Sequence, residues 1–107
     1  MLVVTTDQIP GKSFEALGFV KGNIAKTKNI GRDIIAGFRN IAGGESKSYT
    51  ALIEESETEA LKRMEAEAKK LGADAVVGVR LGSASLASGI CEVMAYGTAV
   101  KIKNDLS

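Results

Sequence analysis

The sequence predicts an α+β fold: a single β-β-α-α-β-β domain in which a long helix packs on one face of an antiparallel-rich sheet. Three observations support this prediction. Residues 46–71 carry apolar side chains at helical spacing and stop at a glycine. The segments 14–25 and 90–103 are apolar and rich in strand-forming residues. The length of 107 residues suits one domain, 1–107, with a core of its own.

The long helix is expected over 46–71. Acidic residues crowd its first half and basic residues its second half, which complements the helix dipole at both ends. Gly72 should follow the last turn, because glycine takes the left-handed conformation of that position without a steric penalty. The apolar stripe that should face the sheet consists of Tyr49, Leu52, Ile53, Ala60, Met64, Ala68 and Leu71.

Two strands should precede the helices, a short one over 2–6 and a long, bent one over 14–25. In the second strand, Val20 and Ile24 should share one face, while Leu17 and Phe19 share the other. Its two glycines, Gly18 and Gly22, indicate a bulge or the close approach of another backbone. A shorter helix is expected over 30–42, where Ile30, Ile34, Ile35, Phe38 and Ile41 share one side.

The C-terminal part should form a strand over 75–81, a hairpin loop over 82–89 and a last strand over 90–103. Alternation in the first of these places Ala75, Val77, Val79 and Leu81 on one face. In the middle of the last strand, neither of the two faces is polar. Since one helix covers only one face, we expect another subunit to cover the other. The two faces carry Val93, Ala95, Gly97 and Ala99, and Met94, Tyr96, Thr98 and Val100.

Composition excludes several classes of function. The net charge is +1 and basic residues are scattered, which argues against nucleic-acid partners and against binding to a membrane. A single cysteine excludes an internal disulfide framework and fits a reducing compartment. The chain shows no signal-peptide pattern and no apolar run of about 20 residues. We therefore expect a cytoplasmic protein.

The start of the shorter helix is the candidate ligand-binding site. Asn29 can cap this helix, and Arg32, Asp33 and Arg39 lie at its start and outer side. One interpretation is a surface ion pair that contributes at most about 1 kcal/mol. The other is an anion site, in which the free N–H groups of the helix start act together with a guanidinium.

Metal binding and catalysis receive little support. The chain has no histidine and one cysteine, whereas soft metals require several thiolate or imidazole ligands. No metal site is therefore predicted within one chain; Cys91 and Glu92 remain candidates only across several subunits. No catalytic residue is predicted, because no nucleophile has a base beside it, and the cofactor is unknown.

Five blocks of sequence occur in order along the chain. They lie at 5–11, 17–22, 29–33, 71–80 and 95–100, the fourth reading Leu71-Gly72-Ala73-Asp74-Ala75-Val76-Val77-Gly78-Val79-Arg80. Together they resemble the YbjQ-like family of small bacterial and archaeal proteins, whose function is unknown and which are often labelled "putative heavy-metal-binding". The resemblance spans almost the whole chain and implies a dodecin-like α+β subunit in a homopentameric ring. It brings no defined catalytic set.

The function expected from these observations is a non-enzymatic, ring-forming binding module that holds a small ligand or ion between subunits. One alternative is an enzyme whose arginine and carboxylate site is completed at the interface; another is a purely structural or partner-docking oligomer. A copurifying ligand would support the first. Turnover that is lost on Arg32→Ala or Asp33→Ala, with the oligomer intact, would support the second.

Overall fold

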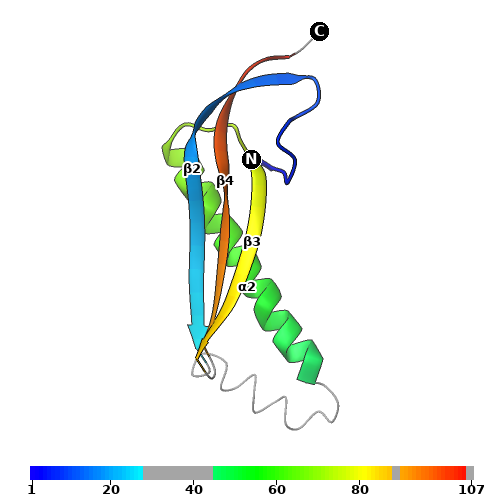
Figure 1. Ribbon diagram of the computed structural model, residues 1–107, viewed down its shortest axis with the longest axis vertical. Coiled ribbons are helices and arrows are strands. Elements are labelled where there is room, and N and C mark those ends of the chain that lie inside the picture. The colour runs from blue at the N-terminus through cyan, green and yellow to red at the C-terminus, as the bar shows by residue number, and fades with distance from the viewer. Residues whose placement is uncertain (28–44, 88–89, 106–107) are drawn as a thin grey trace.

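The computed structural model describes residues 1–27, 45–87 and 90–105. Its elements are β1 (Leu2–Val3), β2 (Lys12–Thr27), α2 (Glu45–Lys70), β3 (Ala75–Ala87) and β4 (Ile90–Asp105). The strands form one sheet in the order β1-β3-β4-β2, in which β1 pairs parallel with β3 and the other pairs are antiparallel (Figure 1). The predicted α+β class is confirmed, with a mixed sheet. The helix predicted over 30–42 lies outside the described residues.

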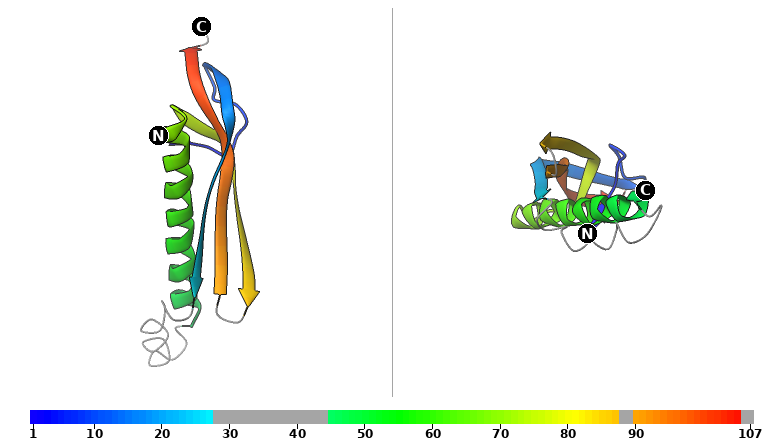
Figure 2. Two further views of the ribbon diagram at one scale, coloured as in Figure 1. Left: turned by 90° about the vertical axis from the view of Figure 1, so that its left-hand side faces the viewer. Right: turned by 90° about the horizontal axis from the view of Figure 1, so that it is seen from below.

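The molecule is elongated, with α2 lying along one face of the sheet (Figure 2). Its extents are 58 × 22 × 17 Å and its radius of gyration is 17.3 Å. A compact globule of 100 residues has a radius of gyration of about 13 Å. The described part of the chain is therefore one helix on one long, narrow sheet, with no second helix on the opposite face.

The C-terminal end of α2 is closed as the sequence predicts. Gly72 has a φ of 81°, and its N–H donates to the carbonyl of Lys69 at 3.0 Å. The N–H of Ala73 donates to the carbonyl of Ala68 at 3.1 Å. These two bonds form a Schellman motif, which satisfies carbonyls of the last turn that have no partner within the helix.

The buried stripe of α2 is narrower than predicted. Ser56, Ala60, Met64 and Ala68 are buried, whereas Ile53 is 43% exposed and Leu71 is 48% exposed. The prediction was wrong for these two residues: the buried stripe steps by four residues from Ser56, which leaves Ile53 at its margin, and Leu71 lies beyond the last turn. The hydroxyl of Ser56 donates to the carbonyl of Leu52 at 2.8 Å, so the buried oxygen is satisfied. Beneath the stripe lie Val20, Val76, Val79, Val93, Ala95 and Ala99.

The two glycines of β2 perform the two roles that the sequence predicts. A register shift lies between Ala16 and Gly18, whose φ is 146°. A Cβ at Gly22 would lie 2.3 Å from the carbonyl oxygen of Ala60, so Gly22 is where strand and helix meet most closely. The bulge also corrects one prediction: Leu17 packs against the cluster beneath α2 rather than sharing the face of the exposed Phe19.

Two predictions for β3 were wrong. The strand continues through residues 82–87, where a hairpin loop was expected, because this small, polar segment pairs with β4: Ser83 lies opposite Val93. The alternation predicted over 75–81 is also broken. A register shift follows Val77, with Gly78 at a φ of 61°, so Val77 and Val79 join different clusters.

Candidate functional site

The predicted ligand-binding residues Asn29, Arg32, Asp33 and Arg39 all lie in 28–44, outside the described residues. Of the two candidates for a metal shared between chains, Glu92 is half-buried in β4 and lies opposite Ala25 and Ala84. Cys91 lies in the same strand, at a position whose side chain is outside the description. The ligand-binding site expected at Asn29, Arg32, Asp33 and Arg39 therefore stays a prediction, as does a metal shared between chains through Cys91 and Glu92.

The face of the sheet that does not carry α2 is called the helix-free face. At one end of the sheet, the N-terminal segment of the same chain covers this face. Val4 and Ile9 of the N-terminal segment pack with Phe14 against a buried cluster of Ala75, Val77 and Val100. Backbone bonds hold this segment along β3. The N–H of Val4 donates to the carbonyl of Val76, those of Gly78 and Val79 donate to the carbonyls of Thr6 and Val4, and all three bonds are 2.8–3.0 Å long.

The remainder of that face carries an aromatic pair. Phe19 of β2 is 66% exposed, the largest exposed fraction among the large apolar side chains of the described part. Its ring lies 6.2 Å from that of the half-buried Tyr96 of β4, at an interplanar angle of 37°. The register places Met94, also half-buried, on the same face as Tyr96. Monomers rarely leave such a group of large apolar side chains open to water.

Two positively charged residues flank Tyr96 of the aromatic pair. Tyr96 lies opposite Lys21 on one side and Arg80 on the other, so that one cation stands on each neighbouring strand. The guanidinium of Arg80 is held by the carbonyl oxygens of Thr5 and Val79, both 2.9 Å from Nη1. The side chain of Lys21 is exposed and forms no hydrogen bond or ion pair with any residue that the structure describes. We call Phe19, Lys21, Arg80, Met94 and Tyr96 the open face.

The two cations beside Tyr96 were not predicted from the sequence. Phe19 and Tyr96 were each placed in a strand, but nothing in the sequence gives the register that sets Lys21 and Arg80 beside Tyr96. The available signal was limited to Lys21 lying two residues from Phe19 in an alternating strand.

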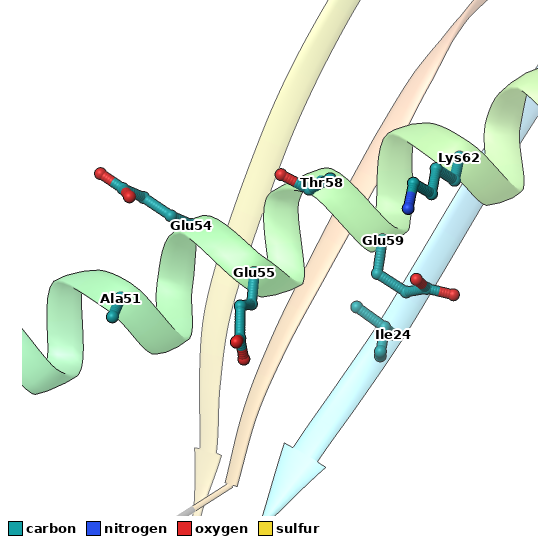
Figure 3. A pocket seen from close by; sticks show the side chains of 7 residues that line it. All are labelled: Ile24, Ala51, Glu54, Glu55, Thr58, Glu59 and Lys62. Atoms are coloured by element: carbon teal, nitrogen blue, oxygen red, sulfur yellow. The ribbon is translucent and has the colours of Figure 1, made fainter. Parts of the chain in front are cut away.

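On the other side of the sheet, a hollow of about 690 Å³ lies between the first half of α2 and the end of β2 (Figure 3). Glu55 and Glu59 extend from the side of the helix on which Ile24 of β2 lies, whereas Glu54 extends from the opposite side. Glu59 is bonded to the guanidinium of Arg63 at 3.4 Å. The outward surface of this half of the helix is acidic.

Comparison with known proteins gives the family. The family model described as "Putative heavy-metal-binding" matches residues 1–103. The chain belongs to the YbjQ-like family. It is similar to a UPF0145 protein of Fervidobacterium nodosum, with 56% identity over 104 residues and 96% of each chain covered. A UPF0145 protein of Thermotoga maritima is 51% identical over 96% of this chain and 98% of its own.

A solved structure of low sequence identity has the same fold. It is the crystal structure of a protein of unknown function from Pediococcus pentosaceus, assigned to the DUF74 family. The TM-score is 0.68 at 16% identity, and the match covers 96% of this chain and 98% of the other. At this identity the likeness supports the fold alone.

The donor chemistry of the YbjQ-like chain does not match the metal in the family description. Among the described residues, no three His, Cys, Asp or Glu side chains are grouped so that they can hold a metal ion. Thiolate and imidazole ligands are scarce in the whole chain, with one cysteine and no histidine. The described part of the chain therefore does not fit a heavy-metal site, and a site shared between chains stays a prediction.

Among the carboxylates that the structure describes, Asp74 has a shifted pKa, and its contacts are structural. The carboxylate of Asp74 accepts hydrogen bonds from the backbone N–H of Ile102 at 2.9 Å and from Nζ of Lys101 at 3.2 Å. These contacts, the backbone bond first, lower the pKa of Asp74 below its ordinary value. Asp74 thus fastens the turn after α2 to β4.

Within the described ranges, no helix is both long and apolar enough to span a bilayer.

Proposed function

We propose that this YbjQ-like protein is a subunit of a homopentameric ring and serves as a non-enzymatic binding module for a small ligand or ion at its subunit interfaces. The observation that carries the proposal is the open face. Phe19 is 66% exposed beside Tyr96, and α2 lies on the other side of the sheet. Burying one such aromatic or aliphatic side chain completely contributes about 1.5–3 kcal/mol, so several of them favour self-association strongly.

The shape of the subunit supports the same conclusion. A body 58 Å long and 17 Å thick has a large surface for its volume. The two longer extents of the molecule are 58 and 22 Å, so either broad side is large enough for part of it to contribute the roughly 800 Å² of a stable interface. The helix lies on one side and the open face on the other, so one copy can contact two neighbours in a head-to-tail ring.

The mass of the untagged protein tests the ring. Light scattering at micromolar concentration should give about five times the chain mass of 11.2 kDa. A stable species near 11.2 kDa would refute the oligomer. Native mass spectrometry of the purified assembly tests the second part: we expect a reproducible excess of mass above the apo-oligomer. An assembly that binds nothing from the cell would leave a purely structural role.

A further inference from the structure

We propose that the acidic first half of α2 covers the open face of the next copy. The contact centres on Ile53, Glu54 and Glu57, which meet the aromatic pair and Lys21 of the neighbouring subunit. This inference rests on the proposed oligomer and names the two surfaces that join in it.

The open face calls for an acidic, partly apolar partner. Its apolar area is made by Phe19, Met94 and Tyr96, and its cations are Lys21 and Arg80. Glu92 lies on the same face but two residues along β4 from Met94, toward the end of the sheet. Both charged side chains of the open face itself are therefore cations; the carboxylate of Asp7 lies beside it, against Gly78.

The first half of α2 has the opposite charge. Residues 51–59 include four glutamates and no basic residue, whereas the basic residues of α2 are Lys47 in its first turn and those from Lys62 onward. Within this stretch, Ile53 is 43% exposed and Glu54 is exposed, while Glu57 is half-buried. An exposed apolar side chain surrounded by carboxylates is the complement of exposed rings flanked by cations.

Charge also decides between the two ways in which copies can cover this face. If two open faces met each other, Lys21 and Arg80 of one copy would lie against the same cations of its partner, and like charges at an interface cost several kcal/mol. Contact with the acidic helix replaces that repulsion by attraction. The interface is therefore heterologous, and it gives a closed assembly only if its rotation closes a ring.

Charge reversal tests this pairing. We expect Lys21→Glu to raise the concentration at which the assembly dissociates by about tenfold or more at low salt, because a repulsion replaces an attraction. Adding Glu54→Lys and Glu57→Lys to that variant should recover most of the loss. High salt should shrink both effects, since exposed charges are screened beyond about 8–10 Å. The measurement is sedimentation equilibrium at two salt concentrations.

Lys69→Glu is the matched control, since it makes the same change of charge at an exposed position in the last turn of α2. We expect it to leave assembly within about twofold of the wild type. Circular dichroism should show that each variant is folded. A wild type that is monomeric would refute the proposed oligomer itself. An oligomeric wild type with no loss in Lys21→Glu, no recovery in the triple variant, or an equal loss in Lys69→Glu would refute only the docking surface.

Discussion

Replacing Gly22 by alanine should destabilise the fold more than adding one methyl group at any other position of β2. The new Cβ would lie 2.3 Å from both the carbonyl oxygen of Ala60 and the backbone nitrogen of Met64, and 2.7 Å from Cβ of Arg63. Ordinary contacts begin near 3.4 Å. The obstacles are mostly helix backbone, which cannot rotate away, so α2 must move off the sheet by about 1 Å.

The cost follows from what α2 buries. Overpacking a core typically costs about 1–3 kcal/mol, and Gly22→Ala should lie at the upper end, because the shift also loosens Ala60 and Met64, both at 0% exposure. For a domain of this size, about 3 kcal/mol corresponds to a fall in Tm of roughly 12–24 °C. The assay is thermal unfolding by circular dichroism at one fixed protein concentration.

Gly82→Ala is the control for this experiment. A Cβ at Gly82 meets no atom within 4 Å, and that glycine has no positive φ. We expect its Tm to stay within about 4 °C of the wild type, or to rise slightly as the unfolded chain loses freedom. If Gly22→Ala also stayed within that range, the close approach of α2 to β2 would be refuted.

Two further predictions concern the turn after α2. Gly72→Ala should cost about 1–2 kcal/mol, because the residue must keep a φ of 81°, and chemical denaturation measures the loss. The lowered pKa of Asp74 means that its charge contributes stability above the pKa of the unfolded chain, and that this stability is lost as the pH falls through the lower, folded pKa. Denaturation midpoints for Asp74→Asn should therefore fall less between neutral pH and about pH 3 than those of the wild type; an identical acid dependence would contradict the linkage.

Elements whose apolar residues recur at a regular spacing could be predicted from the sequence. The spacing of Ala60, Met64 and Ala68 identified the long helix, and these residues pack in one cluster with Val93, Ala95 and Ala99 of β4. Ile53 was predicted to face the sheet because the predicted apolar stripe was broader than the buried one, which takes only every fourth residue from Ser56. The continuation of β3 was missed because pairing with β4, rather than the propensity of Ser83 and its neighbours, holds it in the sheet.

Alternation in the last strand predicted that Met94 and Tyr96 share a face, but the rest of the open face could not be predicted, because it depends on register. Alternation gives the face of a residue only until a bulge interrupts it. Leu17 precedes the bulge of β2 and packs toward the helix, whereas Phe19 follows it and is exposed to solvent. Arg80 likewise follows the irregularity at Gly78, which aligns it with Tyr96. The charges beside the rings emerge only when three strands are paired.

The two bulges also explain why the open face lies where it does. Gly18 lies opposite Ala99, and Gly78 lies between the pairs Val77–Thr98 and Arg80–Tyr96, so both irregularities flank β4 at nearly the same level. On one side of that level, the N-terminal segment covers the helix-free face around Val77. On the other side its cover ends, and Phe19 and Tyr96 lie at this boundary. The chain thus supplies its own cover for one end of the sheet, and the aromatic pair marks where cover from another copy must begin if the proposed ring is correct.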